Sequence, residues 1–522
     1  MSKKYFYVTT PIYYVNDLPH IGHAYTTIAA DVLARFKRMD GFETFFLTGT
    51  DEHGSKVEQT AQKNNEQPIE LANRVVQRFQ NLWKKLLITH DDFIRTTEER
   101  HKKVVTHMIK TVLDQGDIYL GNYEDWYCTP CETFWTKTQL DNKGRCPECH
   151  REVQKLKEES YFFKMSKYEA PLIDYINKNP HFIEPESRRN EILSFIKEGL
   201  RDLSISRTTV TWGVPMPQTD KTNFPHIVYI WFDALLNYVS GLGYFDNKDR
   251  FQKFWPEAIH LIGKDILRHH TIYWPTFLMA LGLPLPKKIF AHGWWTHEGE
   301  KMSKSKGNFI EPEALIDEYG VDPLRYFVLR EIPFGSDGDF SNSALIGRIN
   351  SDLADDYGNL LNRTITMTLK YQEGKVLKPS SITPIDQELV EKYTSMRISY
   401  KKNMDDIAFH KALTALWEAI RFTNKYIDSN EPWKLSKDES KKERLNDVLG
   451  FTLEAIRIAS VLISPFMPQT AGKALSALGI QGFSCGTAKE KGIDALCGFW
   501  ENQKEFKVQK TDPLFKKYEI SL

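Results

Sequence analysis

Two histidines near the start of this sequence have the type and spacing to hold a triphosphate. His20 and His23 are three residues apart, so their rings face the same side of a helix that starts near residue 20. The amides and dipole of a helix N-terminus attract anions, and two imidazoles there could donate to phosphate oxygens. Gly22 leaves room for an adenine or ribose against the backbone. The alternative is an ordinary capped helix with incidental histidines.

A second group of polar residues lies far along the chain. Lys301, Lys304 and Lys306 fall within six residues, among serines and a glycine. This composition predicts a mobile cationic loop that could clamp a triphosphate and neutralise charge on departing pyrophosphate. Taken alone, such a charge run is more typical of a solvated loop or of a stretch that contacts nucleic acid.

Four cysteines form two pairs with the spacing of metal ligands. Cys128 and Cys131 enclose two residues, as do Cys146 and Cys149, and 14 residues separate the pairs. Each pair can hold one ion from a tight turn, and four thiolates complete the tetrahedral shell of one structural zinc ion. A redox-active site is the competing interpretation, and a free-standing zinc ribbon that binds nucleic acid would show the same spacing.

The elements predicted around these residues form an α/β domain. Residues 4–10 alternate as a strand, apolar residues recur at helical spacing over 21–39, and residues 42–47 form a second apolar run. Strand, helix and strand open a doubly wound parallel sheet of the Rossmann type. Later, strands are predicted over 225–232, 258–262 and 288–292, and helices over 233–242 and 266–281.

The composition changes between these two halves and again after them. The intervening stretch is rich in turns and cysteines, which indicates an insertion with a zinc knuckle, and helical spacing after residue 345 indicates an all-α bundle. We therefore expect the first half of the Rossmann domain over 1–115, the insertion over 116–228, the second half over 229–293, the lysine loop with a stem-contact region over 294–345, and the helical domain over 346–522.

Bulk composition is less informative. The 522 residues include 69 basic and 69 acidic side chains, so any surface for nucleic acid must be local. Six cysteines do not make a disulfide scaffold, no apolar run is long enough to span a bilayer, and the N-terminus lacks the apolar core of a signal peptide. We expect a cytoplasmic protein that does not interact with membranes.

The order of the two phosphate-binding motifs resembles that of class I aminoacyl-tRNA synthetases, with the histidines after the first strand and the lysines after the last. Within that class, the sequence resembles the methionyl-tRNA synthetase family along nearly its whole length. The matching stretches are residues 9–16 (TTPIYYVN), 49–54 (GTDEHG), 229–235 (YIWFDAL), 262–266 (IGKDI) and 292–295 (HGWW). The resemblance implies a ligase that activates L-methionine with ATP and Mg²⁺, releases pyrophosphate and charges tRNA(Met) for initiation and elongation.

The resemblance also implies roles for particular residues. His20, His23, Lys301 and Lys304 would be catalytic, and Gly22, Gly263, Lys264, Asp265 and Lys304 would bind ATP. Methionine would be bound by Ile12, Tyr14, Asp51, Trp231, Ala234, Tyr238, Ile266, His270 and Trp274, and the anticodon by Asn359, Arg363 and Trp433. Asp51 can pair with the substrate ammonium, and Tyr or His donors can reach the thioether. Plain core packing is the alternative for the aromatic residues.

Some features depart from the family pattern and leave other interpretations open. Only one zinc knuckle is visible, Leu235 replaces a proline, and no further C-terminal domain follows, which favours a monomer. The alternatives are a class I synthetase for cysteine, leucine or valine, a tRNA-binding or regulatory protein that has lost catalysis, and a small-molecule nucleotidyltransferase. A large helical bundle has no use in the last of these.

Overall fold

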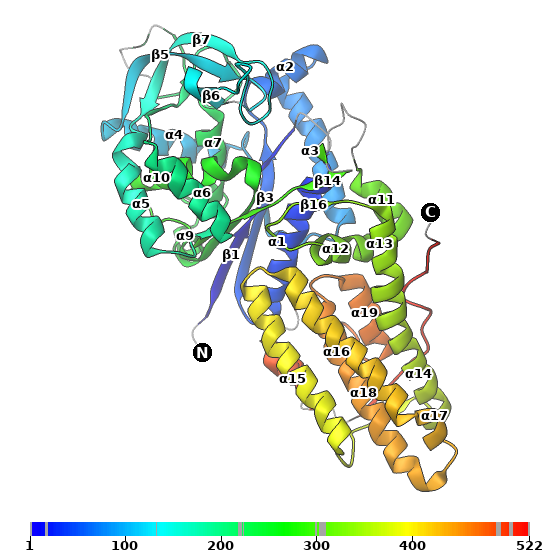
Figure 1. Cartoon of the computed structure of the whole chain (residues 1–522). Helices are drawn as coiled ribbons and strands as arrows, with labels where there is room; N and C mark the ends of the chain where they lie inside the picture. Colours follow the sequence, from blue (N-terminus) through cyan, green and yellow to red (C-terminus); the bar gives the residue numbers. More distant parts are fainter. Residues whose placement is uncertain are drawn as a thin grey trace.

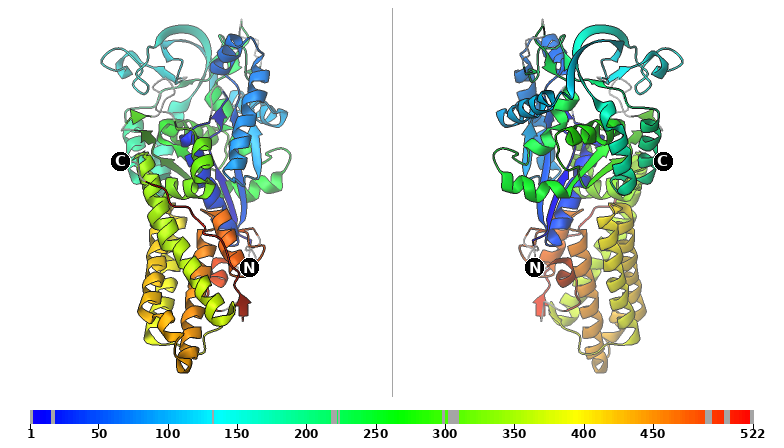
Figure 2. Two further views of the ribbon diagram at one scale, coloured as in Figure 1. Left: turned by 90° about the vertical axis from the view of Figure 1, so that its right-hand side faces the viewer. Right: turned by 90° about the vertical axis from the view of Figure 1, so that its left-hand side faces the viewer.

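The computed structural model describes residues 3–15, 19–131, 133–217, 222, 224–297, 300–301, 310–486, 492–500 and 505–519. An α/β body contains the N-terminal part of the chain, and long helices extend from it as a bundle (Figure 1). Two side views show the elongated shape that results (Figure 2). None of the helices in these described ranges is long and apolar enough to cross a membrane.

A parallel sheet forms the centre of the α/β body. Its strand order is β2-β3-β1-β12-β13-β8, and β4 also pairs with β3. The strands are β1 (Tyr5–Thr9), β2 (Tyr13–Tyr14), β3 (Glu43–Asp51), β4 (Asp92–Arg95), β8 (Ile183–Glu184), β12 (Ala258–Gly263) and β13 (Lys288–His292). Because β1 lies between β3 and β12, the N-terminal strand joins the two halves expected from the sequence, and the predicted Rossmann-type fold is confirmed.

Helices cover both faces of this sheet, and each face has its own apolar core (Figure 1). Along β1, Phe6 and Val8 belong to one core, and Tyr7 belongs to the other. Successive side chains of a strand point to opposite faces, which accounts for this alternation. The helices of the body are α1 (Ile21–Met39), α2 (Ser55–Lys63), α3 (Pro68–Lys85), α4 (Glu99–Asp114), α7 (Ile230–Leu235), α8 (Asn237–Ser240), α9 (Lys248–Phe254) and α10 (Trp274–Ala280).

Three predicted elements differ from those observed, including the helix expected over 233–242, which is divided into α7 and α8. The strand expected over 225–232 is reduced to β11 (Ile227–Val228), which pairs with β10 (Ser206–Arg207), because α7 begins at Ile230. A short apolar run does not distinguish a buried strand from a buried helix. The helix expected over 266–281 is interrupted by a π-helical turn, η5 (His269–Tyr273), just before α10.

The insertion has its own antiparallel sheet, with strand order β6-β5-β7-β9. These strands are β5 (Ile118–Cys128), β6 (Thr133–Trp135), β7 (Gln154–Phe163) and β9 (Leu203–Ser204), and the helices α5 (Glu169–Lys178) and α6 (Glu186–Lys197) lie between β7 and β9 in the chain. Strand β8, between these helices, pairs with β13 and forms the edge of the central sheet. The segment therefore contributes to both sheets.

The C-terminal part is helical, as predicted. A small sheet of β14 (Trp295–His297), β15 (Glu300–Lys301) and β16 (Gly338–Asp339) precedes it, with α11 (Pro312–Tyr319) and α12 (Val321–Arg330). The bundle contains α13 (Asn342–Arg348), the π-helix η7 (Ile349–Gly358), α14 (Asn359–Gln372), α15 (Pro384–Asp405), α16 (Phe409–Asn430), α17 (Pro432–Leu435), α18 (Lys442–Ile463), α19 (Pro468–Ala477) and α20 (Gly492–Leu496). A two-stranded ladder of β17 (Lys375–Leu377) and β18 (Glu505–Lys507) was not expected.

A buried arginine joins the body to the bundle. Arg325 in α12 donates to Oδ2 of Asp31 in α1 at 2.7 Å and to the carbonyl oxygen of Phe466, between α18 and α19, at 2.8 Å. Both side chains of the ion pair are inaccessible to solvent. Arg35 and Arg325 hold the pKa of Asp31 at about 2, although burial alone would raise it. The ion pair therefore fixes α1, whose N-cap is His20, against α12 and the bundle.

Candidate functional site

A cavity of about 380 Å³ lies where β1, β3, β12 and β13 end. Its wall contains Asp51, Gly263 and His292, the last residues of β3, β12 and β13, together with residues that directly follow β1. The chain passes from β1 toward β3 on one side and later adds β12 on the other side of β1, so the cavity is at the topological switch point. Ligands of open α/β sheets bind at that position.

The cavity brings together most of the residues singled out in the sequence. The lining includes Ile12, Tyr14, His20, Gly22, His23, Asp51, Trp231, Ala234, Tyr238, Gly263, Asp265, Ile266 and His270. These residues come from both halves of the sheet, so only the folded chain makes them neighbours.

Among the residues predicted to bind methionine or ATP whose side chains the structure describes, Trp274 and Lys264 do not line the cavity. Trp274 is fully buried behind Tyr238, with the ring centroids 6.0 Å apart, and its indole N–H donates to Nε2 of His260 at 3.3 Å. Lys264 places its ammonium 2.6 Å from Oδ2 of Asp337 and 4.1 Å from the centre of the Trp294 ring. Trp274 therefore supports the cavity wall from behind, and Lys264 is held beside Trp294 at the edge of the cavity.

The two motif histidines form the start of α1. Nδ1 of His20 accepts the N–H of Gly22 at 3.0 Å, and Nδ1 of His23 accepts the N–H of His20 at 3.3 Å. Their rings stack with centroids 3.7 Å apart, and burial holds the pKa of His23 well below its usual range. With each Nδ1 accepting, each ring carries its proton on Nε2. A Cβ at Gly22 would meet Cε1 of His20 at 2.9 Å, so glycine is required here for this stack.

Another part of the cavity wall is aromatic. Tyr238 stacks on His260 with the ring centroids 4.1 Å apart, and Trp231 stacks on His269 at 3.7 Å. Asp51, with only 3% of its surface exposed, lies in the same cavity as these rings. The arrangement combines one carboxylate with an apolar surface, which suits a ligand that carries an ammonium group and an apolar side chain.

Several lining residues were given no binding role in the sequence analysis. They are Pro11, Tyr13, Ile21, Tyr25, Thr26, Leu235, Asn237, His292, Gly293, Trp294 and Trp295. Some carried a usable signal, because His292 ends a predicted strand and residues 293–295 follow it, where binding residues gather in this fold. Tyr25 and Thr26 carried none, because they read as ordinary positions on the buried face of α1.

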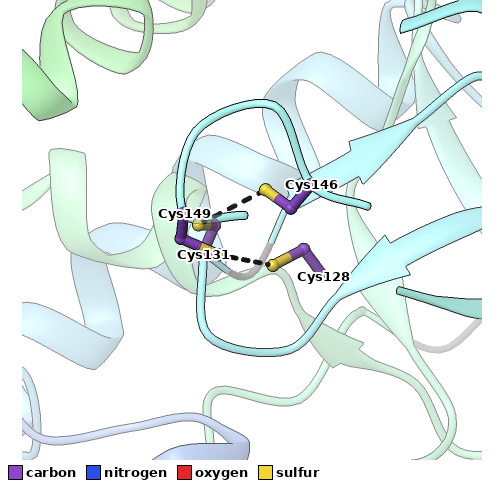
Figure 3. A group of neighbouring side chains, drawn as sticks. All are labelled: Cys128, Cys131, Cys146 and Cys149. Carbon is purple, nitrogen blue, oxygen red and sulfur yellow. Dashed lines mark hydrogen bonds between the residues drawn. The ribbon is translucent and has the colours of Figure 1, made fainter. Parts of the chain in front are cut away.

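The four paired cysteines converge at the tip of the insertion (Figure 3). Their sulfur atoms all lie within 4.8 Å of one another, with 3.4 Å between Cys128 and Cys149 and 3.8 Å between Cys131 and Cys146. Zinc–sulfur bonds of about 2.3 Å in a tetrahedron require sulfur separations of about 3.8 Å. The cluster therefore fits one zinc ion. Trp135 packs against it from β6.

The predicted lysine loop is largely outside the described part of the chain. Lys304 lies outside the described residues, and for Lys301 only the backbone is described, as the last residue of β15. That strand pairs with β14, whose first residue, Trp295, directly follows Trp294 and also lines the cavity. The loop therefore starts only a few residues after residues that line the cavity.

The three residues predicted to read an anticodon lie in the bundle. Asn359 begins α14, and Arg363 follows one turn later. The guanidinium group of Arg363 donates to Asp428 at 2.8 Å and to the side-chain oxygen of Asn424 at 3.0 Å. Trp433 lies in α17 with 38% of its surface exposed, near the end of the bundle away from the sheet (Figure 1).

Comparisons with known proteins agree with this architecture. Residues 6–157 and 151–365 match a family described as tRNA synthetases class I (M), and residues 376–519 match the anticodon binding domain of methionyl tRNA ligase. The methionine–tRNA ligase of Caldanaerobacter subterraneus subsp. tengcongensis is 52% identical over 92% of this chain and 74% of its own length. The corresponding protein of Bacillus subtilis is 49% identical, over 98% and 78% of the two chains.

A solved structure extends this similarity to three dimensions. The Mycobacterium tuberculosis methionyl-tRNA synthetase in complex with methionyl-adenylate has a TM-score of 0.93 and 41% identity, and the match covers 98% of this chain and 99% of that one. Sequence and fold therefore agree over almost the entire chain.

Proposed function

Because this chain belongs to the methionyl-tRNA synthetase family, and so joins methionine to tRNA at the expense of ATP, we propose that its central cavity holds methionine and ATP side by side. The observation that carries this proposal is the position of His20 and His23, which lie at the start of α1 and line the same cavity as Asp51 and the rings of Trp231 and Tyr238. One half of the cavity suits an anion and the other suits an amino acid.

Methionine occupies the aromatic half in this proposal. The carboxylate of Asp51 binds the substrate ammonium, and the side chain lies among Ile12, Tyr14, Trp231, Ala234, Tyr238, Ile266 and His270. A thioether makes favourable contacts with aromatic rings, so this wall suits sulfur. Trp274 contributes indirectly, because it packs behind Tyr238.

ATP occupies the half formed by the start of α1 and the end of β12, as its Mg²⁺ complex. His20 and His23 donate to the phosphates, Gly22 and Gly263 allow close approach, and Asp265 accepts from the ribose. Lys301 and Lys304 bind the pyrophosphate. A contact from Lys264 requires its ammonium to leave Asp337. Burial lowers the pKa of His23, so its neutral imidazole can donate a hydrogen bond from Nε2.

In this proposal the enzyme promotes the reaction by positioning methionine and ATP. An oxygen of the methionine carboxylate attacks the α-phosphorus, the bond to the bridging oxygen breaks, and pyrophosphate leaves with both electrons of that bond. The carboxylate is already ionised, so this step needs no general base, and catalysis rests on alignment and charge stabilisation. A hydroxyl group of the terminal adenosine of tRNA then attacks the methionyl carbonyl and releases AMP.

The remaining assignments concern tRNA and the metal. Asn359 and Arg363 bind the edges of anticodon bases, and Trp433 stacks on one base. Arg363 must exchange Asp428 for the base. The zinc ion is structural, because four thiolates leave no open coordination position. The enzyme works as a monomer in the cytoplasm.

Amino-acid-dependent exchange of pyrophosphate into ATP tests the proposal. The full chain would be assayed with each of the 20 amino acids, without tRNA. Methionine alone should support rapid exchange, because an apolar cavity with one carboxylate and aromatic rings favours an uncharged, polarizable side chain. Faster exchange with cysteine, leucine or valine would contradict the assignment of the pocket. A substitution of Asp51→Asn should then raise KM for methionine by roughly 10- to 100-fold, which corresponds to the loss of one charged hydrogen bond.

A further inference from the structure

A buried carboxylate behind the cavity joins two histidines from distant parts of the chain. Oδ2 of Asp233 lies 2.6 Å from Nδ1 of His53, and Oδ1 lies 2.9 Å from Nε2 of His101. Nδ1 of His101 lies 2.8 Å from the hydroxyl group of Ser240. Asp233 is 1% exposed and His101 is inaccessible, so this is an interior network.

We propose that Asp233 is the positioning residue that sets the geometry of the methionine pocket, an inference that rests on the function proposed above. Asp233 does not line the cavity itself, whereas Ala234, the next residue of α7, does. Its carboxylate acts on Asp51 through His53, and on Tyr238 through His101 and Ser240. It touches neither substrate nor reacting atoms.

The network ties together the segments that form the walls of the pocket. His53 follows Asp51 by two residues, so its bond to Asp233 fixes the end of β3 against α7. Ser240 follows Tyr238 by two residues in α8, so the bond through His101 fixes α8 against the same carboxylate. The group that holds the ammonium and the rings that surround the thioether are thereby kept at a fixed separation.

The charge of Asp233 explains why the histidines are needed. Burial alone would raise the pKa of this carboxyl group, but His53 and His101 hold the pKa well below its usual range. An ionised carboxylate in the interior requires such partners, and loss of one of them is strongly unfavourable. The segment that carries His53 is fixed from another side as well, because the indole N–H of Trp212 donates to the carbonyl oxygen of Glu52 at 2.6 Å.

Pyrophosphate exchange with the full chain tests this role, with methionine and ATP varied separately. Asp233→Asn keeps the shape of the side chain but can accept from only one imidazole N–H. We expect KM for methionine to rise about tenfold or more, with KM for ATP unchanged within about twofold. Asp352→Asn is the matched control, because Asp352 is also 1% exposed and bonded to Tyr326 and Arg421, but lies in the bundle. It should lower the melting temperature and leave KM for methionine unchanged.

A pair of substitutions at His101 keeps the proposal testable if Asp233→Asn does not fold. The amide nitrogen of His101→Gln can occupy the position of Nε2 and donate to Asp233, whereas that of His101→Asn is close to the position of Nδ1 and cannot reach the carboxylate. His101→Gln keeps the donor to Asp233 but loses the contact with Ser240, so it should raise KM for methionine clearly less than His101→Asn, which removes the donor to Asp233 and should raise KM about tenfold. Equal KM values in the two variants, or parallel increases in KM for methionine and ATP, overturn the positioning role. If the wild-type chain shows no methionine-dependent exchange, the proposed function itself fails.

Discussion

The hydroxyl group of Tyr238 donates a hydrogen bond to Nε2 of His270 at 2.8 Å. The contact of the other ring nitrogen, Nδ1, shows which of the two groups is the donor. Nδ1 lies 2.9 Å from the carbonyl oxygen of Ile266, which can only accept, so Nδ1 carries the ring proton. Burial lowers the pKa of His270 to about 4, so the ring stays neutral. The hydroxyl proton of Tyr238 and the ring proton of His270 are therefore both donated within the protein. A thioether beside them would contact ring surfaces instead of the hydrogen-bond donors expected from the sequence.

Tyr238→Phe should weaken methionine binding by releasing His270 from its fixed orientation in the pocket wall. The substitution leaves Nε2 of His270 buried without a donor, at a cost of about 1–3 kcal/mol that the imidazole avoids by turning away from the pocket. We expect KM for methionine in pyrophosphate exchange to rise about tenfold and KM for ATP to stay unchanged. Tyr393→Phe is the control, because Tyr393 is also buried and bonded, to Thr423 at 2.9 Å in the bundle. The same increase in KM for both variants would contradict the assignment.

Acid should destabilise the protein through its buried histidines. Below the unfolded pKa of 6.5, an unfolded chain binds a proton at His270 that the folded chain refuses until about pH 4. The stabilisation is present above pH 6.5 and is lost as the pH falls toward 4, by roughly 3 kcal/mol at about 1.4 kcal/mol per unit. Burial shifts the pKa of His260 and His269 in the same direction. Urea unfolding at several pH values between 7 and 5 measures this loss.

His269→Phe isolates one contribution to that pH dependence. Within the described residues, neither ring nitrogen of His269 has a hydrogen-bond partner, although its ring stacks on Trp231. Phenylalanine keeps the stack and removes the group that titrates, so the variant should be more stable than wild type at pH 5 and its stability should change less with pH. A steeper dependence in the variant would refute this explanation.

The sequence predicted the fold best where local signals and tertiary structure agree. Helix α1 begins and ends as predicted because its apolar spacing, its cap at His20 and the left-handed Gly41, with φ of 86°, are local. Strands β12 and β13 are apolar runs buried on both faces, which is the pattern of a central parallel strand. At residues 225–232 the same kind of run folds partly as α7, and only packing decides between the two.

The residues of the candidate site divide in the same way, into those placed by local sequence signals and those placed only by tertiary packing. Asp51 and Gly263 end strands, so their place beside the cavity follows from the sheet topology. Asn237 lines the cavity at the start of the short helix α8, a position that the periodic spacing of the helix predicted over 233–242 does not mark. Lys264 lies in a matching motif, yet its side chain points to Asp337, which is 73 residues away in the chain.

Metal analysis should find one zinc ion per chain, held by the four clustered cysteines. Cys131→Ser replaces one thiolate with a poorer ligand, so it should lower the zinc content well below one and make the remaining three thiols reactive toward a thiol reagent. Cys485→Ser is the control, since that cysteine is buried near Ser464, far from the cluster in the chain. A zinc-free wild-type protein, or equal loss in both variants, would disprove the site.

Trp433→Ala should separate the two steps of the reaction. Trp433 is exposed in α17, within the half of the bundle away from the sheet, so removing it leaves the cavity intact (Figure 1). One base–aromatic stack contributes about 1–3 kcal/mol, which corresponds to a fall of roughly 5- to 150-fold in kcat/KM for tRNA charging. Methionine-dependent pyrophosphate exchange should be unchanged. Ile398→Ala is the control, because Ile398 is an exposed apolar residue on α15, with 65% of its surface accessible, and should affect neither assay. Equal losses in charging and exchange for Trp433→Ala would mean that this side chain supports the fold of the enzyme and does not bind the anticodon.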